Sequence, residues 1–133
     1  MEKVAVYYVK KVDEEHSNMS SIQLEKIDHW CNENNYKYNL FVDEVKSRLD
    51  IENRESLDLL KEFVSKGVYS NIIIYNLPNI SRNTKFNLDL ISFAEDNNCR
   101  ITSMDGFNSH KYFEFMRKIL NENKEELERW IMK

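Results

Sequence analysis

A polar stretch with chemically useful side chains, Asn76–Asn83, follows directly after the apolar run Ile72–Tyr75. Four consecutive β-branched or aromatic residues bounded by turn-forming residues predict a central strand that is covered on both faces. In an open parallel sheet, ligands bind just beyond the carboxyl ends of the strands. We therefore expect a functional site within Asn76–Asn83, where Arg82 is the residue best suited to hold an anion.

Other chemically capable residues form weaker patterns. The three histidines do not cluster along the chain, so we predict no metal site. The pair Asp43-Glu44 is compatible with a metal or acid–base site, although a solvated or structural role is favoured. Asp13-Glu14 resembles the acidic pair of receiver domains, but Asn76–Asn79 lacks the aspartate that such a domain needs after its third strand. Glycine-rich phosphate loops are absent from the sequence, which argues against a nucleotide-binding enzyme, and no cofactor is expected.

The composition is typical of one globular domain. The 133 residues are 41% hydrophobic and 32% charged, and no linker or repeat divides them. No apolar run approaches the roughly 20 residues that span a bilayer, and Met1-Glu2-Lys3 leads into a predicted strand without a cleavage-site pattern. Cys31 and Cys99 lie in or beside apolar segments, so we expect buried, reduced thiols in a cytoplasmic protein. The net charge of −4 argues against strong autonomous DNA binding.

Hydrophobic periodicity predicts alternating strands and helices. Four segments have the apolar content of strands: Val4–Val9, Tyr36–Val42, Ser70–Tyr75 and Arg100–Met104. Four segments carry apolar residues at helical spacing: Ile22–Asn34, Arg54–Lys66, Thr84–Asn97 and Ser109–Met132. Asp13–Ser21 and Asp43–Asn53 are expected to be polar loops, and Gly67 to end the second helix. Strands that alternate with helices imply right-handed crossovers and a parallel sheet, so the predicted fold class is α/β.

The last predicted helix, Ser109–Met132, is longer than a small sheet needs for cover, because about 24 helical residues span about 36 Å. One apolar stripe runs along it: Phe113, Met116, Leu120, Leu127 and Ile131. We predict that the second half of this helix binds a partner helix, most simply in a homodimer. The alternative interpretation is a frayed tail.

The order of these segments resembles the N-terminal catalytic domain of the serine site-specific recombinases, the resolvase/invertase family. The resemblance covers residues 3–106, and residues 107–133 fall where the family has its long dimerisation helix. It rests on segments that match in order and spacing: Tyr8-Val9-Lys10, Ser20-Ser21 with Gln23, Phe41–Glu44, Asn53-Arg54, Leu57–Leu60, Gly67–Tyr75, Leu77–Asn83 and Ile101–Gly106. The resemblance implies a three-layer fold, with a mainly parallel sheet of four to five strands flanked by helices and a long C-terminal helix.

The resemblance also implies a chemistry. The family cleaves DNA with a serine at the end of the first strand and forms a 5′-phosphoserine link within a synaptic tetramer. Arginines around the scissile phosphate position it and stabilise its charge. Carried onto this chain, the family's Tyr-x-Arg-x-Ser becomes Tyr8-Val9-Lys10-Lys11-Val12, so Lys10 replaces the arginine and Val12 replaces the nucleophile. A register shifted by one residue places Asp13 at the nucleophile position instead.

The loop after the third strand departs from the family in the same way. The usual Asp-Arg pair becomes Pro78-Asn79, whereas Arg54 and Arg82 remain. A missing nucleophile lowers the rate of a hydrolytic triad on the order of a million-fold, and lysine lacks the bidentate fork of arginine. Four serines are alternative nucleophiles, and none is favoured: Ser17, Ser20, Ser21 and Ser81. The candidates for phosphate or DNA binding are Lys10, Arg54, Ser81 and Arg82.

The sequence therefore predicts a non-catalytic relative of the recombinases, a pseudoenzyme, with an α/β domain at 1–106 and a dimerisation helix of the same domain at 107–133. Its expected role is that of an oligomerising interaction or regulatory protein in DNA recombination, on a mobile element, which pairs with an active recombinase or holds DNA weakly. Two alternatives remain open. One is a divergent or excised catalytic domain that still exchanges DNA strands, and the other is a phosphate or small-ligand binding module.

Overall fold

The fold is built on one parallel sheet. The computed structural model describes residues 2–12, 18–115, 117 and 118. Its strands are β1 (Glu2–Lys11), β2 (Tyr36–Val45), β3 (Asn71–Ile74) and β4 (Arg100–Ser103). They lie in the order β2-β1-β3-β4, and every adjacent pair is parallel. Its helices are α1 (Met19–Glu33), α2 (Glu55–Ser65), α3 (Leu77–Ile80) and α4 (Thr84–Asp96).

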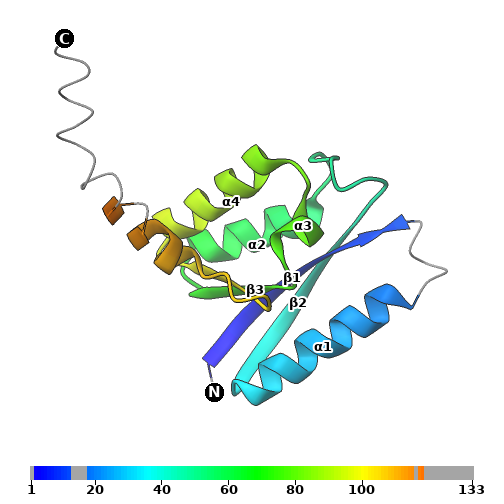
Figure 1. Ribbon diagram of the computed structural model, residues 1–133, viewed down its shortest axis with the longest axis horizontal. Helices are drawn as coiled ribbons and strands as arrows, with labels where there is room; N and C mark the ends of the chain where they lie inside the picture. The colour runs from blue at the N-terminus through cyan, green and yellow to red at the C-terminus, as the bar shows by residue number, and fades with distance from the viewer. Residues whose placement is uncertain (1, 13–17, 116, 119–133) are drawn as a thin grey trace, which may run out of the picture.

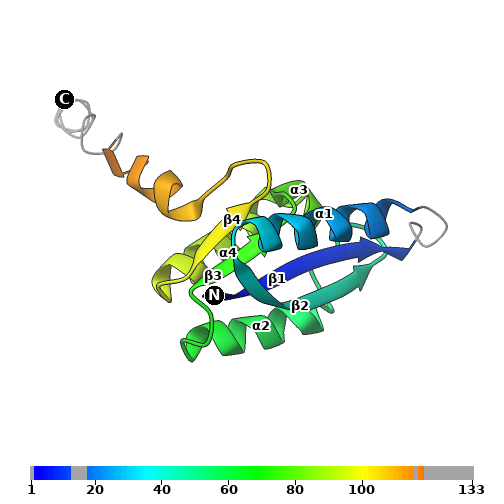
Figure 2. The same cartoon turned by 90° about the horizontal axis from the view of Figure 1, so that it is seen from below.

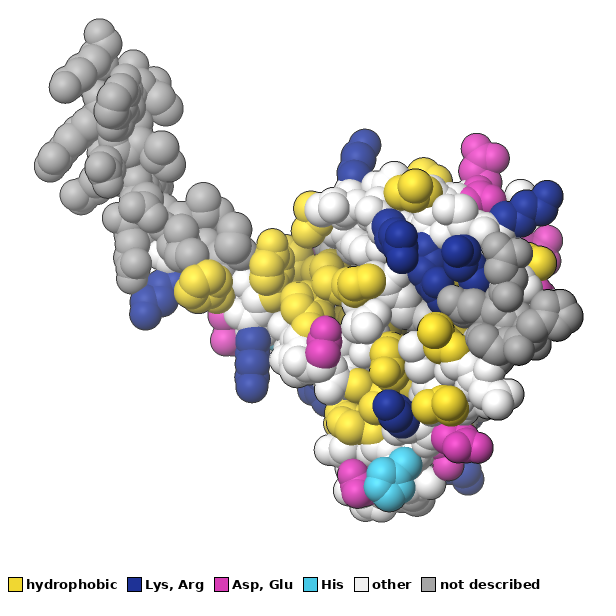
Figure 3. Space-filling model, turned by 45° about the vertical axis from the view of Figure 1, so that its right-hand side comes forward, with side chains coloured by type: hydrophobic (Ala, Val, Ile, Leu, Met, Phe, Trp, Pro, Cys, Tyr) yellow, Lys and Arg dark blue, Asp and Glu magenta, His cyan; other side chains and the backbone are white. Residues whose placement is uncertain are grey.

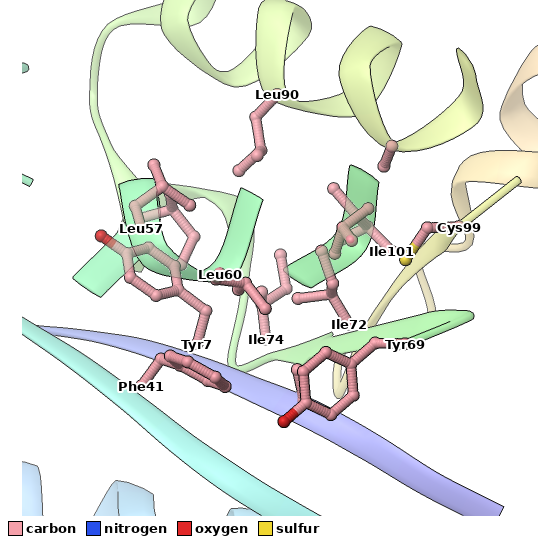
Figure 4. Close-up of a cluster of buried hydrophobic side chains, with 14 of the residues drawn as sticks. Tyr7, Phe41, Leu57, Leu60, Tyr69, Ile72, Ile74, Leu90, Cys99 and Ile101 are labelled. Atoms are coloured by element: carbon pink, nitrogen blue, oxygen red, sulfur yellow. The ribbon is translucent and has the colours of Figure 1, made fainter. Parts of the chain in front are cut away.

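The helices form a layer on each side of this sheet, because side chains alternate between the two faces of a strand. On β1, Ala5, Tyr7 and Val9 join a core cluster with residues of α2 and α4, which Figure 4 shows packed between these helices and the strands. Val4, Val6 and Tyr8 join a second cluster with Ile27 and Cys31 of α1. Figures 1 and 2 show α1 and α2 on opposite sides of β1 and β2. The predicted three-layer α/β fold is confirmed.

Several predicted boundaries were wrong. β1 and β2 extend beyond their apolar centres, because they pair in register from Glu2 with Tyr36 to Lys11 with Val45. The backbone of a polar residue can hydrogen-bond to a neighbouring strand as readily as the backbone of an apolar residue. β2 therefore includes Asp43, which was expected in a loop. α1 likewise begins at Met19, inside the expected loop.

The expected loop Asn76–Asn83 contains the short helix α3. The Asn79 backbone N–H donates to Asn76 Oδ1 at 2.8 Å, and Pro78 lies in the first turn. An asparagine cap followed by proline is a local signal for the start of a helix. Asn83 caps α4 in the same way, since its Oδ1 accepts from the Phe86 N–H at 3.0 Å.

The final described segment is anchored to the domain. Residues 109–115 are helical, and the buried Ser109 hydroxyl accepts a hydrogen bond from the Ile101 N–H at 2.7 Å. His110 pairs with Glu95 of α4, and Phe113 packs against the core cluster of the same chain. Four members of the predicted apolar stripe lie outside the described residues: Met116, Leu120, Leu127 and Ile131.

Candidate functional site

The side chain of Asn79 binds the backbone near the carboxyl end of β1, and we call this pair of hydrogen bonds the clamp. The Val9 N–H donates to Asn79 Oδ1 at 3.2 Å, and Asn79 Nδ2 donates to the Val9 carbonyl at 3.0 Å. The amide of Asn79 thus continues the sheet where β3 has ended, pairing with β1 as another strand would. Asn79 is 6% exposed. Asn79, which stands at the position of a family arginine, therefore hydrogen-bonds to the backbone of β1 and offers no positive charge to a substrate.

Val12, at the family's nucleophile position, lies three residues beyond this clamp and is 41% exposed. Its side chain has no group that could attack a phosphate. Two of the four alternative serines are buried: Ser81 Oγ donates to the Arg48 carbonyl at 2.7 Å, and Ser20 Oγ accepts from Tyr8 at 3.4 Å. Ser21 is exposed on α1, and Ser17 lies outside the described residues.

Arg54 is an interior residue, only 3% exposed. Its guanidinium donates to the Ile80 carbonyl at 2.8 Å, to the Asp50 carbonyl at 2.9 Å and to the Tyr7 hydroxyl at 3.3 Å. Its guanidinium carbon also lies 5.1 Å from the centroid of the Phe86 ring. These contacts join the α2 amino end to the segment after β3, so they make Arg54 a cross-link within the fold.

Asp43 is the anionic partner in the same interior network. Its carboxylate accepts from the Tyr7 hydroxyl at 2.7 Å and from the backbone N–H groups of Ser56 and Leu57, both at 2.9 Å. Asp43 therefore caps α2 from a neighbouring strand, where a carboxylate also meets the positive end of the helix dipole. Burial, followed by the Asp43 hydrogen bond, raises the pKa of Tyr7, so this hydroxyl stays protonated. We refer to Tyr7, Asp43 and Arg54 as the inner cluster.

Arg48 links the segment after β2 to the ends of two other strands, and the sequence did not predict this role. Its Nε donates to the Asn79 carbonyl at 3.0 Å, and its Nη2 donates to the Val9 carbonyl at 3.3 Å. Its own carbonyl accepts from the Arg82 N–H at 3.0 Å and from Ser81 Oγ. The segment after β2 is thereby fixed to the ends of β1 and β3. The rule that directed attention to the end of β3 applies equally to β2, and it would have found Arg48.

A small hollow of about 50 Å³, which we call the basic hollow, is lined by Lys11, Ser47, Arg48, Leu49 and Arg82. A neighbouring hollow of about 140 Å³ shares Arg48 and Arg82 and reaches Gln23 on α1. Figure 3 shows Lys and Arg side chains gathered on one face of the molecule. The arrangement brings together Lys11, the last residue of β1, with Arg48 and Arg82, which follow β2 and β3, and Arg82 is the predicted anion-binding residue.

Lys10 does not line either hollow among the described residues. Val9 belongs to the core cluster on the side of α2 and α4, and Tyr8 to the cluster on the side of α1. Because side chains alternate along a strand, Lys10 lies on the same face of the sheet as Tyr8, and Lys11 lies on the same face as Val9. Lys10 also pairs in register with Glu44 of β2, which places an opposite charge beside it.

The remaining predicted candidates lie apart from this region. His29 pairs with Glu33 on the exposed surface of α1, and His110 pairs with Glu95. Within the described part of the chain, no three His, Cys, Asp or Glu residues are placed to share a metal ion. Cys31 and Cys99 are buried and unpaired with one another, as predicted, and burial raises the pKa of these thiols to about 11 and about 12.

Comparison with known proteins identifies the family. The model of the resolvase N-terminal domain matches residues 5–132, so this chain belongs to that family. It is a resolvase-type serine recombinase domain, of a family associated with DNA recombination and integration, whose domains generally oligomerise and bind DNA. A search of curated proteins found no match. None of the helices in the described residues has the length and apolarity to cross a membrane.

Solved structures share the fold at low sequence identity. The N-terminal catalytic domain of TP901-1 integrase superposes with a TM-score of 0.72 at 18% identity, covering 96% of this chain and 99% of that one. A resolvase family site-specific recombinase from Streptococcus pneumoniae has a TM-score of 0.71 at 19% identity, covering 99% and 94%. The first open reading frame of transposon ISC1904 from Sulfolobus solfataricus has a TM-score of 0.60 at 18% identity, covering 96% and 87%.

Proposed function

We propose that this chain is a non-cleaving recombinase domain that acts through interactions with a recombinase and with DNA. The observation that carries the proposal is the state of the strand ends where the family cuts DNA. Val12 offers no nucleophile, and the amide of Asn79 is bound to the Val9 backbone. Arg54 is bound to carbonyls of its own chain. Phosphoryl transfer depends on positioned charge, which these residues do not supply to a substrate.

The fold supports an interaction role, because its core remains complete around the altered site. The inner cluster satisfies its buried polar groups, and both faces of the sheet are packed. Residues 107–133 are the proposed oligomerisation segment, through which the chain pairs with itself or with an active recombinase. Such a mixed oligomer would contain one subunit that cannot cut, which is a direct means of regulating strand exchange.

A pull-down from lysate of the source cells tests this function, run with and without nuclease and with the retained proteins identified. We expect a serine recombinase to be retained after nuclease treatment. Substituting Leu120→Asp together with Leu127→Asp is expected to abolish that retention. Leu59→Asp is the matched control, because Leu59 is an apolar residue of α2 that is 46% exposed. A protein that stays monomeric and retains neither recombinase nor DNA contradicts the proposal.

A further inference from the structure

We propose that a groove between α3 and α4 binds a small amphipathic acid, that is, an organic molecule with an apolar body, one N–H or O–H donor and a carboxylate. This α3–α4 groove has a volume of about 410 Å³, and the residues that line it include Leu77, Arg82, Thr84, Asn87, Leu88 and Ile91. Small-molecule sites usually have volumes of about 300–1,000 Å³. The inference goes beyond the proposed interaction function and does not depend on it.

The first argument is the apolar part of the groove. Leu88 and Ile91 are three residues apart on α4, so they lie on the same side of this helix. Ile91 is 2% exposed, whereas Leu88 is 43% exposed. Leu77 contributes from α3 and packs against the core cluster. An apolar molecule in the groove would remove the exposed part of Leu88 from water, which is favourable.

The second argument is a hydrogen-bond acceptor without a partner. Asn87 is 9% exposed, and its Nδ2 donates to the Ser81 carbonyl at 2.8 Å and to the Leu77 carbonyl at 3.4 Å. These two acceptors fix the orientation of the amide, because its oxygen cannot take the place of the donor. The buried Oδ1 accepts no hydrogen bond among the described residues. Buried polar atoms nearly always have a partner, and a donor on the ligand would supply the missing one.

The third argument is charge. Arg82 is exposed, and its guanidinium makes no hydrogen bond or ion pair with the described residues. Thr84 is the first residue of α4, so the positive end of this helix dipole lies at the groove. Within the described part of the chain, Arg82 is the one cation that lines the groove, and no carboxylate lines it. A carboxylate matches the two parallel N–H donors of a guanidinium.

The test is two-dimensional amide NMR spectroscopy of the isotope-labelled chain, titrated with indoleacetate as the probe. This molecule combines an apolar ring, one N–H donor and a carboxylate. At the efficiency usual for drug-sized ligands, a probe of about 13 non-hydrogen atoms binds at about 1 mM. We expect saturable shifts of the Thr84 and Leu88 amides and of the Asn87 side-chain amide. An absence of saturable shifts at about ten times that concentration, or shifts confined to other elements, would overturn the proposed site.

Two analogues of the probe test the two polar contacts separately. N-methyl indoleacetate keeps the ring and the carboxylate but lacks the donor, whereas indole-ethanol keeps the ring and the donor but lacks the charge. We expect each analogue to bind about tenfold more weakly than indoleacetate, because each loses one hydrogen bond to a buried or charged group. Equal affinity of all three molecules would show that the groove is only an apolar surface, and it would overturn the assignment of the ligand.

Substitution of Arg82 tests the contact with the carboxylate. Arg82→Gln is expected to weaken the binding of indoleacetate about tenfold and to leave the binding of indole-ethanol unchanged. Lys85→Gln is the matched control, because Lys85 is an exposed cation of α4 that does not line the groove. An equal loss in both variants would contradict a specific contact with Arg82.

Substitution of Leu88 tests the apolar wall. Leu88→Asp places a carboxylate in the groove and is expected to abolish the binding of indoleacetate, because like charges repel. Leu59→Asp is the matched control, since Leu59 is 46% exposed on α2. Circular dichroism and urea unfolding confirm that each variant is folded before its binding is compared. Unchanged binding by the folded Leu88→Asp variant would overturn the site.

Competition with inorganic phosphate at constant ionic strength separates this site from general attraction of anions. We expect indoleacetate to remain bound, because phosphate lacks the apolar body. Complete displacement by phosphate would show an anion site in which the groove has no part, and it would overturn the proposal. The probe has no role in the retention of a recombinase in the pull-down, so the site and the proposed function can each fail while the other stands.

Discussion

The inner cluster and the basic hollow both use polar residues at the carboxyl end of the same sheet, yet they differ in what their charges meet. In the inner cluster, the Arg54 guanidinium and the Asp43 carboxylate are bound to Tyr7, to carbonyls and to backbone N–H groups. In the hollow, the partly buried Arg48 also donates to carbonyls of its own chain, those of Val9 and Asn79, whereas Arg82 is exposed. Of the two arginines that remain at family positions, Arg54 therefore has a structural role, whereas Arg82 is exposed to solvent.

The strongest way to break this comparison is to substitute Arg54. Arg54→Met keeps the aliphatic stem and leaves the buried Ile80 carbonyl and Tyr7 hydroxyl without their donor. We expect the free energy of unfolding to fall by about 3 kcal/mol, because unpaired buried polar groups are costly. Urea unfolding measures the change. Arg82→Met is the control and should stay within about 0.5 kcal/mol, as exposed substitutions usually do. Equal losses in the two variants would erase the proposed distinction.

Asp43→Asn tests the anionic half of the inner cluster. An amide keeps one acceptor oxygen but loses the charge that Ser56, Leu57 and Tyr7 now share. We expect a loss of about 2 kcal/mol, since hydrogen bonds to charged groups contribute more than neutral ones. Glu44→Gln provides the comparison, because Glu44 is the adjacent exposed carboxylate on β2. A neutral effect of Asp43→Asn would show that the cap contributes little.

The interior should also respond to alkaline pH in a way that the surface does not. Burial raises the pKa of Cys99 to about 12, from an ordinary value of 9.0. The unfolded chain therefore loses this proton first, and stability should decline as the pH rises from about 9 toward 12. For one thiol the slope is about 1.4 kcal/mol per pH unit. Urea unfolding at several pH values should show a shallower decline for Cys99→Ala, and an identical decline would contradict this assignment.

The smallest expected effect comes from restoring the hydroxyl alone. Val12→Ser changes an exposed side chain, so stability should move by no more than about 0.5 kcal/mol. Plasmid nicking should remain undetectable, because Lys10 and Asn79 still occupy the positions of family arginines. Adding Lys10→Arg and Asn79→Arg sharpens the comparison, although the second change also removes the clamp on Val9. Nicking by the single variant would show that the site retains more catalytic capacity than its geometry suggests.

The sequence predicted the architecture well, because the architecture follows from periodicity. The helix predicted at Arg54–Lys66 is present as α2 and buries one apolar face, formed by Leu57, Leu60 and Val64, and β3 is a fully buried strand. The resemblance identified Arg54 and Arg82 as the arginines that remain at family positions. Neither source of information could show whether a guanidinium meets a carbonyl of its own chain or solvent.

That distinction depends on contacts between distant residues. Asn79 reaches the Val9 backbone across 70 positions of sequence, and Arg54 reaches the Tyr7 hydroxyl across 47. Local patterns report how a side chain alternates within its own element and carry no signal for such pairs. Arg48 differs from these pairs, because it follows the end of β2, where the strand-end rule predicts a functional residue as it does after β3.

The most direct test of the non-cleaving function is incubation of the purified chain with supercoiled plasmid, followed by a search for nicked circles and for covalent protein–DNA adducts. We expect neither product, at any protein concentration that suffices for DNA binding. An adduct whose peptide maps to a serine of this chain, and which disappears when that serine is replaced by alanine, would contradict it.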